Sequence, residues 1–384
     1  MDLRNFVMLI GDPKNHSMTL VIAEAGVNHN GDENLAFELI DIAKSAGADV
    51  VKFQLFQAEK LTTQKAELAE YQKKNISTDS TQSQYDMLQK LELSPSVFSQ
   101  LANYCSTQGI EFLSTAFDTE SLNFLVHDLG IKKLKIASGE LTNAPFLLEH
   151  SRTGVDIILS TGMSSLAEIT EALGVIAFGY LNLDGYPSKP LIAELMKSNE
   201  AREIISKRVT LMHCTSAYPA PLDQLNLRAM HLLRDEFKTR VGYSDHSDGI
   251  LISPIAVAMG ASVIEKHFTK SKKMQGPDHQ ASLEPNELSS MIIDIRNVEI
   301  GLGKREKAPT SEEKKNLLIA RKSIVANTPI QQGDIFSEAN LSVKRPGSGM
   351  QPIKIWDLIG RHSQNRYDIG ELINEKIDTS NNED

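Results

Sequence analysis

Two histidines stand at the ends of consecutive β-branched runs in this chain of 384 residues. His246 follows the run 240–243 and His267 follows the run 262–265, and strand alternation gives both side chains the inward parity of a barrel. Neutral imidazole nitrogens on adjacent strands can bind one divalent cation and leave positions for water and substrate. A hydrogen-bonded core residue is the commoner outcome for one histidine alone, but the shared parity favours a metal site. His213 also has inward parity and is interpreted as packing or a hydrogen-bond partner.

Two lysines occupy similar positions and predict an anion site. Lys52 follows an apolar run and would point into a desolvated interior, where an ammonium group needs an anionic partner. Lys135 and several hydroxyls follow neighbouring runs: Thr115, Ser138, Ser160 and Ser244. Together these groups suit a phosphate or a phosphorylated carboxylic acid. The alternative interpretation pairs each lysine with a nearby carboxylate such as Glu24.

These side chains need a scaffold that brings the ends of many strands together. Eight short β-branched runs recur, most of them followed by a stretch with helical spacing: 20–23, 49–53, 110–113, 133–136, 156–159, 209–212, 240–243 and 262–265. This alternation predicts a (β/α)8 (TIM) barrel, in which active sites lie at the carboxyl ends of the strands. An open doubly wound sheet is the alternative, but no GxGxxG turn follows the first run. In the barrel, Cys214 would have outward parity and pack against the helices.

Composition changes near residue 303 and predicts two folded parts. Residues 1–303 would form the barrel, 304–315 a charged linker around a short helix, and 316–384 a small β-rich domain. Residues 33–46 read as an amphipathic helix, and Ser165 with Glu168 resembles a capping box. The long, polar connection 54–109 is expected to arch over one barrel mouth.

Charge and cysteine content exclude several classes of protein. The net charge of −10 opposes long-range attraction to nucleic acid or an anionic membrane, so an anionic ligand must be held by a local pocket. Two cysteines offer no disulfide framework, which fits a reducing compartment. Residues 1–12 do not resemble a signal peptide, and no apolar stretch reaches about 20 residues. We therefore expect a soluble, cytoplasmic protein.

Ten motifs in order carry a resemblance to a known enzyme family. The chain is similar to the sialic-acid (nonulosonate) synthases from about residue 19 to residue 375. The motifs are IAEAGVNHNG (22–31), VKFQ (51–54), LST (113–115), KIASGE (135–140), LSTGM (159–163), HCT (213–215), YSDH (243–246), EKHF (265–268), GPD (276–278) and KRPG (344–347). The carboxyl-terminal part resembles that family's antifreeze-like (SAF) domain.

The resemblance implies a condensation of phosphoenolpyruvate with the open-chain aldehyde of an N-acetylated aminohexose. The products would be a nine-carbon 2-keto acid and phosphate, formed with carbon–oxygen cleavage. His246 and His267 would hold Mn2+, or another divalent ion such as Mg2+ or Co2+, that polarises the aldehyde. Glu24 would manage a proton near the reacting centre.

The same resemblance implies the substrate contacts. Phosphoenolpyruvate would be bound by Lys52, Thr115, Lys135, Ser138, Ser160 and Ser244, whereas Gln54, Tyr218 and Asp278 would face the sugar. Arg345 would reach the acetamido group in the barrel of a second subunit, which implies a domain-swapped homodimer.

Two departures from the sialic-acid-forming pattern bear on the sugar. Ser216 replaces the usual Asn after His-Cys-Thr, and Leu55-Phe56 replaces Thr-His. Apolar groups near the sugar would suit a 6-deoxy diacetamido sugar, so we favour a synthase of the N,N'-diacetyllegionaminate type. An N-acetylneuraminate synthase that uses N-acetylmannosamine is the alternative, and a pseudaminate synthase is a weaker one.

Two further hypotheses differ in kind. A Schiff-base aldolase would use Lys52 or Lys135 as a nucleophilic amine, and borohydride reduction with pyruvate would trap the lysine covalently. A carbohydrate-binding scaffold without catalysis would leave the enclosed lysines unexplained.

Overall fold

The computed structural model describes residues 18–68, 72–73 and 83–376 of the chain. The chain divides into two compact units, Met1–Lys304 and Arg305–Asp384. Residues 1–12, which bear on the expectation that no signal peptide is present, lie outside the described residues.

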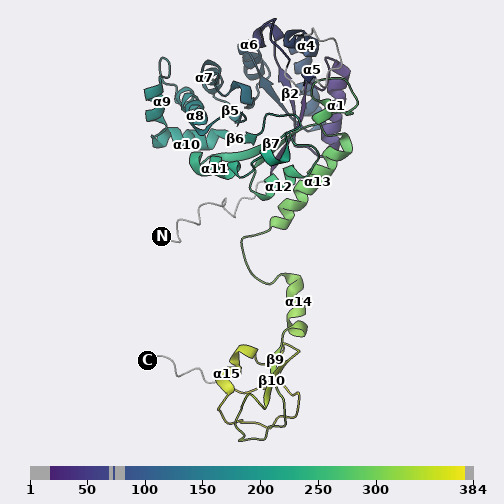
Figure 1. The fold of residues 1–384 in the computed structure, drawn as a ribbon, viewed down its shortest axis with the longest axis vertical. Helices are drawn as coiled ribbons and strands as arrows, with labels where there is room; N and C mark the ends of the chain where they lie inside the picture. The colour runs from purple at the N-terminus through teal and green to yellow at the C-terminus, as the bar shows by residue number, and fades with distance from the viewer. Residues whose placement is uncertain (1–17, 69–71, 74–82, 377–384) are drawn as a thin grey trace. The chain divides into compact units, whose positions relative to one another are not determined.

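The first unit is a closed barrel of parallel strands that pair in chain order (Figure 1). The strands are β1 (Leu20–Gly26), β2 (Val50–Leu55), β3 (Glu111–Ala116), β4 (Lys133–Ile136), β5 (Asp156–Ser160), β6 (Val209–Cys214), β7 (Arg240–Asp245) and β8 (Val263–His267). Each one contains a run identified in the sequence, and the predicted (β/α)8 barrel is confirmed.

Helices surround the barrel (Figure 1). They are α1 (Glu33–Ala46), α2 (Ala58–Leu61), α4 (Gln84–Leu91), α5 (Pro95–Gln108), α6 (Thr119–Asn123), α7 (Ala144–Arg152), α8 (Leu166–Tyr180), α9 (Lys189–Leu195), α10 (Asn199–Arg208), α11 (Ala229–Phe237), α12 (Ile252–Ala258) and α13 (Pro285–Leu302). The helix predicted at 33–46 is present. The capping box of α8 is also present, with Ser165 and Glu168 each accepting from the other's backbone N–H.

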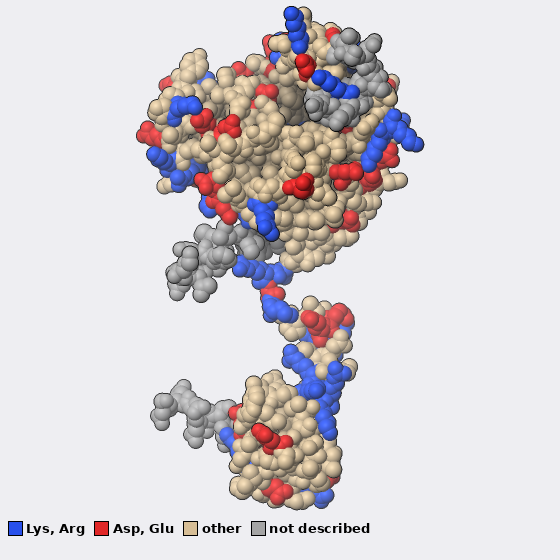
Figure 2. All heavy atoms as spheres, viewed as in Figure 1, with Lys and Arg blue, Asp and Glu red and all other residues tan. Residues whose placement is uncertain are grey.

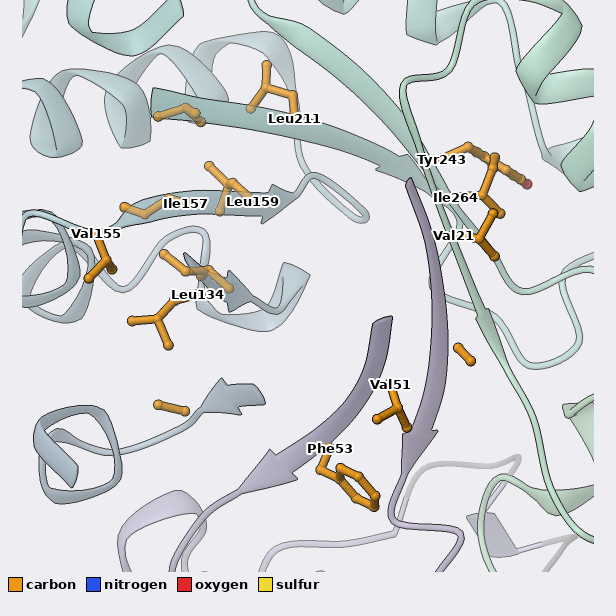
Figure 3. Packing of buried hydrophobic residues seen from close by; sticks show 14 of the residues in the cluster. Val21, Val51, Phe53, Leu134, Val155, Ile157, Leu159, Leu211, Tyr243 and Ile264 are labelled. Atoms are coloured by element: carbon orange, nitrogen blue, oxygen red, sulfur yellow. The ribbon is translucent and has the colours of Figure 1, made fainter. Parts of the chain in front are cut away.

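The core of the barrel unit has two layers, one on each side of the strands. Between strands and helices lies a large apolar layer that includes Val51, Phe53 and Leu159 (Figure 3). Inside the barrel, a smaller layer consists of Leu20, Ile22, Val50, Leu113, Ile158, Met212 and Val263. A Cβ atom on Gly242 would lie 2.4 Å from Met212 Sδ and 2.5 Å from the Val263 carbonyl oxygen, so only glycine fits there. This apolar layer is the floor of the barrel interior. The polar residues at the carboxyl ends of the strands lie above it and line one mouth of the barrel.

The end of β2 differs in part from the expectation that Leu55 and Phe56 make the sugar site apolar. Leu55 packs in the layer between strands and helices, and Phe56 packs with Val27, Met87 and Leu91 beneath α4. Leu55 therefore does not line the mouth, and the expectation that it makes the sugar site apolar was wrong, whereas for Phe56 that expectation stays a prediction. The cause is strand parity, because Leu55 alternates with the inward-facing Gln54.

The second unit is small and has its own core. It contains α14 (Ser311–Ala320), an antiparallel pair formed by β9 (Ser323–Ala326) and β10 (Leu341–Lys344), and α15 (Ile355–Leu358). Its core residues are Ile324, Ala326, Ile330, Phe336, Leu341, Leu358, Tyr367 and Ile373. The predicted β-rich SAF-like fold is confirmed, and β9 and β10 are paired strands within it.

Charged side chains of both signs are mixed on the surface. On the face of the first unit drawn in Figure 2, Lys and Arg lie among Asp and Glu, and neither sign forms a continuous patch. Within residues 18–68, 72–73 and 83–376, no helix has the length and apolar character that crossing a membrane requires.

Candidate active site

The register of the barrel places ionisable residues side by side at one mouth. Glu24 on β1 pairs with Lys52 on β2 and with His267 on β8. On the other side of β8, Glu265 pairs with Ser244 of β7. These residues share the inward parity of the apolar floor beneath them. The pairing of β8 with β1, which closes the barrel, therefore brings these residues together at the centre of the site.

Two lysines and two carboxylates form a buried cluster there. Lys52 Nζ lies 2.6 Å from Glu24 Oε2 and 3.6 Å from Glu265 Oε2, and Lys135 Nζ lies 3.1 Å from Glu265 Oε1. All four side chains are at most 4% exposed. The cluster includes the Lys52–Glu24 pair that the sequence left as an alternative. Glu265 is a residue that the sequence analysis missed as a member of the site.

The lysines determine the charge state of this cluster. Burial opposes ionisation of Glu265, but the Lys135 and Lys52 ammonium groups hold its pKa well below the usual range. Burial raises the pKa of Glu24 above its usual value, against the opposing effect of Lys52. Burial would lower the pKa of Lys52, but the two carboxylates raise it. Lys52 and Glu265 thus stay charged, whereas burial shifts Glu24 toward its protonated form.

Hydroxyl groups extend the cluster around the mouth. Thr115 Oγ1 accepts from Lys52 Nζ at 3.3 Å, and Ser244 Oγ donates to Glu265 Oε1 at 2.9 Å. Ser160, at the end of β5, is 2% exposed. Ser138 and Ser216 face each other, with their Oγ atoms 3.3 Å apart.

The close approach of these strand ends depends on Gly162. A Cβ atom at this position would lie 2.4 Å from Ser216 Oγ, 2.8 Å from Cys214 Sγ and 3.2 Å from Ser138 Oγ. Glycine therefore lets the turn after β5 pack against the ends of β4 and β6.

Cys214 and His213 exchange the faces that the sequence analysis assigned to them. Cys214 Sγ faces the mouth beside Gly162, and the charge of Lys135 acts on its thiol. His213 lies outside the barrel, where its Nε2 bonds to the Leu225 carbonyl at 2.7 Å. Both assignments were wrong because β6 is apolar on both faces, so its pattern does not mark the inward one. Burial raises the pKa of the Cys214 thiol, which keeps it protonated and poorly suited to act as a nucleophile.

The two predicted histidine ligands lie together beside the lysine cluster. The ring centroids of His246 and His267 are 5.8 Å apart, and the Tyr218 ring packs against His246 at a centroid distance of 4.2 Å and a tilt of 34°. The Thr215 carbonyl lies 2.8 Å from His246 Nδ1, so Nδ1 carries the proton and Nε2 keeps its lone pair. Burial lowers the pKa of His246 to about 4 and that of His267 well below its usual value. Both imidazoles are therefore neutral at pH 7, as metal binding requires.

The chemistry of this histidine pair fits a divalent cation. His267 Nδ1 is buried and has no hydrogen-bond partner among the described residues. In that same part of the chain, no three His, Cys, Asp or Glu side chains form a group that could hold an ion. An ion held by His246 and His267 would thus take its other ligands from water and substrate, as in an open catalytic site.

Two of the residues expected to face the sugar lie on the Glu24 side of the mouth. Gln54 Nε2 donates to Glu24 Oε1 at 3.1 Å. Burial, with a smaller effect of the Glu24 charge, raises the pKa of Asp278 to about 7. Asp278 is therefore a carboxyl group that can give or take a proton at neutral pH.

The raised pKa of Asp278 predicts how stability depends on pH. The unfolded chain loses this proton near pH 4 and the folded chain near pH 7, so the free energy of unfolding falls as pH rises across that window. Asp278→Asn removes this contribution, and the variant should gain stability relative to wild type from pH 4 to pH 7. Denaturant unfolding in chelator at a series of pH values measures the difference. Below pH 4, the plots of unfolding free energy against pH should be parallel for wild type and variant. Plots that are also parallel from pH 4 to pH 7 would contradict the raised pKa of Asp278.

Arg345 lies in the second unit, directly after β10. Its Nε donates to the Ala320 carbonyl oxygen at 3.0 Å, and the side chain is exposed.

The chain is similar to known proteins over most of its length. Residues 39–307 match the NeuB family, and residues 321–374 match the SAF domain. The chain is 47% identical to the N,N'-diacetyllegionaminic acid synthase of Campylobacter jejuni, over 93% of this chain and 99% of that protein. It is 44% identical to the enzyme of the same name from Legionella pneumophila, over 91% of each chain.

A solved structure supports the same grouping. The N-acetylneuraminic acid synthetase of Leptospira borgpetersenii, in complex with citrate, matches with a TM-score of 0.63 and 30% identity, over 78% of this chain and 90% of that one. The NeuB model spans more than half of the chain, and nearly the whole length of a 47% identical synthase is matched. The chain is therefore an enzyme that belongs to the NeuB family and carries a SAF domain.

Proposed function

We propose that the enzyme condenses phosphoenolpyruvate with the open-chain aldehyde of a 6-deoxy diacetamido mannose-type sugar. The products are an acid of the N,N'-diacetyllegionaminate type and phosphate. The observation that carries the proposal is the meeting of Lys52, Lys135, His246 and His267 around two carboxylates at one barrel mouth. The substrate class rests on the similarity to the two named diacetyllegionaminic acid synthases.

The cationic side of the site binds phosphoenolpyruvate. Lys52 and Lys135 neutralise the carboxylate and phosphate groups, and the neighbouring hydroxyls orient them: Thr115, Ser138, Ser160 and Ser244. Glu265 holds both ammonium groups in place before the anion arrives, which reduces the reorganisation that binding requires.

The sugar binds beside phosphoenolpyruvate at the same mouth. Gln54, Ser216, Tyr218 and Asp278 face its hydroxyl and acetamido groups in this proposal. His246 and His267 would hold Mn2+, or another divalent cation such as Mg2+ or Co2+, beside the aldehyde. When bound, such an ion acts as a Lewis acid on the aldehyde oxygen.

The reaction forms one carbon–carbon bond and breaks one carbon–oxygen bond. Carbon 3 of phosphoenolpyruvate attacks the aldehyde carbon, and water adds at carbon 2. Glu24, which lies between Lys52 and His267 in the register of the barrel, takes a proton from that water. The bond between carbon 2 and the bridging oxygen then breaks, and phosphate leaves with that oxygen. One proton of the water ends on the former aldehyde oxygen and the other on phosphate.

The choice of sugar gives a direct test. With Mn2+ present, kcat/KM for 2,4-diacetamido-2,4,6-trideoxymannose should exceed that for N-acetylmannosamine by about 100-fold, within the range that one or two pocket contacts supply. Phosphate release under saturating phosphoenolpyruvate measures both values. Comparable turnover of the two sugars, or preference for N-acetylmannosamine, would contradict the assigned substrate and favour the neuraminate-forming alternative.

The second unit completes the site in this proposal, which places the enzyme in the cytoplasm as a homodimer. Arg345 of one subunit binds the acetamido group of the sugar held in the other subunit's barrel. Arg345→Ala should therefore raise KM for the sugar about tenfold or more, as expected for a lost hydrogen bond from a charged donor. Initial rates at varied sugar and at varied phosphoenolpyruvate separate the two effects. A change confined to KM for phosphoenolpyruvate would show that this role is wrong.

A further inference from the structure

A buried ion pair lies directly behind the two histidines. Asp245 is the last residue of β7 and Lys266 is the next-to-last residue of β8, and the two are register partners across these strands. Lys266 Nζ lies 3.2 Å from Asp245 Oδ2, and both side chains are 0% exposed. Each residue immediately precedes one of the histidines, on the opposite face of its strand.

Additional hydrogen bonds satisfy this pair. Asp245 Oδ1 accepts from the backbone N–H of Ser247 at 2.9 Å and from its hydroxyl at 2.6 Å. Asp245 Oδ2 accepts from Ser253 Oγ at 2.7 Å, and Lys266 Nζ donates to the Ser247 carbonyl oxygen. The network therefore links the end of β7, the end of β8, the turn after His246 and helix α12.

Stability alone does not account for such a network. A buried ion pair costs so much desolvation that well-packed apolar residues of similar size are often as stabilising. Its distinctive property is geometric, because a fully satisfied buried network permits few alternative arrangements. Here the geometry that it restricts is the position of two strand ends, each of which continues into a histidine.

We propose that the Asp245–Lys266 pair positions His246 and His267 so that their lone pairs converge on one divalent cation. Asp245 and Lys266 are positioning residues, since both lie outside the barrel and act through the backbone of β7 and β8. The inference rests on the proposed function, which places the cation at these histidines. It adds a determinant of metal affinity on the outer face of the barrel.

The test uses a variant that removes both charges together. Asp245→Asn combined with Lys266→Met leaves no unpaired buried charge. Its Mn2+ dissociation constant, measured by electron paramagnetic resonance titration without substrate, should rise about tenfold, the lower end for partners that orient metal ligands. At saturating Mn2+, KM for phosphoenolpyruvate should stay within about twofold of wild type, because Lys52 and Lys135 lie on other strands. Circular dichroism and thermal unfolding confirm the fold of each sample.

A second, partly exposed ion pair offers a control. Arg296 Nη2 lies 2.7 Å from Asp49 Oδ2, directly before β2 at the opposite end of the barrel. Asp49→Asn combined with Arg296→Met also removes one acidic and one basic side chain, and it should leave the Mn2+ dissociation constant unchanged. An equal loss of affinity in both double variants would mean that the effect is general loosening of the barrel, which overturns the inference.

The remaining outcomes are also decisive. A folded Asp245→Asn/Lys266→Met variant that binds Mn2+ as tightly as wild type overturns the positioning role alone. A wild-type enzyme that binds no Mn2+ overturns the metal site and this inference with it. If the double variant does not fold, Ser253→Ala removes one hydrogen bond to Asp245 and should weaken Mn2+ binding about threefold. An unchanged dissociation constant in folded Ser253→Ala then refutes the proposal.

Discussion

Replacing His267 by alanine should lower Mn2+-dependent phosphate release about a thousandfold and leave the fold intact. The expected loss corresponds to several kcal/mol of transition-state stabilisation, the contribution of a Lewis acid at the aldehyde oxygen. His267 lies at the end of β8, and its buried Nδ1 has no hydrogen-bond partner among the described residues, so the substitution breaks no hydrogen bond of this atom to them. Continuous phosphate release with saturating phosphoenolpyruvate and sugar measures the effect.

His231→Ala provides a matched control for this loss. His231 lies on α11, where its Nε2 bonds to the Met259 carbonyl at 3.0 Å, away from the barrel mouth. This variant should keep its activity within about threefold of wild type. Wild-type enzyme treated with chelator should behave like His267→Ala and recover when Mn2+ is restored. An active His267→Ala enzyme that still responds to Mn2+ would refute the ligand assignment.

Replacing Lys135 by methionine should separate stability from substrate binding. Loss of its ammonium leaves Glu265 with Lys52 at 3.6 Å and the Ser244 hydroxyl, so the free energy of unfolding should fall by about 3 kcal/mol. Loss of a charged contact to substrate should lower kcat/KM for phosphoenolpyruvate about 100-fold. Denaturant unfolding and initial rates measure the two effects.

A double variant tells these effects apart. Lys135→Met with Glu265→Gln removes the uncompensated carboxylate, so stability should return toward wild type whereas kcat/KM for phosphoenolpyruvate should not. Lys133→Met is the control on the same strand, because the partly exposed Lys133 pairs with Glu111 at the other end of β4. Recovery of phosphoenolpyruvate binding in the double variant would mean that Lys135 acts only by supporting the fold.

The barrel was predictable because each strand is a short β-branched run with a polar end. The inward parity of β1, β2, β7 and β8 also followed from sequence, since polar Glu24, Lys52, Ser244 and Glu265 alternate with apolar or small residues. The same reasoning failed on β6, where Val209 and Leu211 pack outward and Met212 packs inward. An apolar run that is buried on both faces carries no information about which face is inside.

The missed role of Glu265 had a signal in the sequence. Two enclosed lysines require negative charge, and Glu265 shares the parity of His267 in the EKHF motif. Asking which carboxylate could balance Lys135 would have identified it. The pKa of Asp278, in contrast, depends on how the segment after β8 folds over the mouth, and local sequence does not determine that burial.

Two segments of the sequence favoured a diacetamido sugar, and the structure places them differently relative to the mouth. The segment containing Ser216 does lie at the mouth, beside Ser138 and Gly162. Leu55 packs between the strands and the helices, so it does not face the sugar, and Phe56 packs with Val27 and Met87. We therefore expect sugar specificity to depend on residues around Ser216 and Tyr218 rather than on Leu55.

The central claim is that the lysine pair and the histidine pair bind one enol phosphate beside one metal-activated aldehyde. Metal-free enzyme can be incubated with phosphoenolpyruvate and 2,4-diacetamido-2,4,6-trideoxymannose, with and without Mn2+, followed by phosphate assay and mass analysis of the acid. The account predicts that Mn2+ switches on the release of one phosphate for each nine-carbon keto acid formed. Turnover that ignores both chelator and Mn2+, together with a lysine trapped by borohydride and pyruvate, would contradict it.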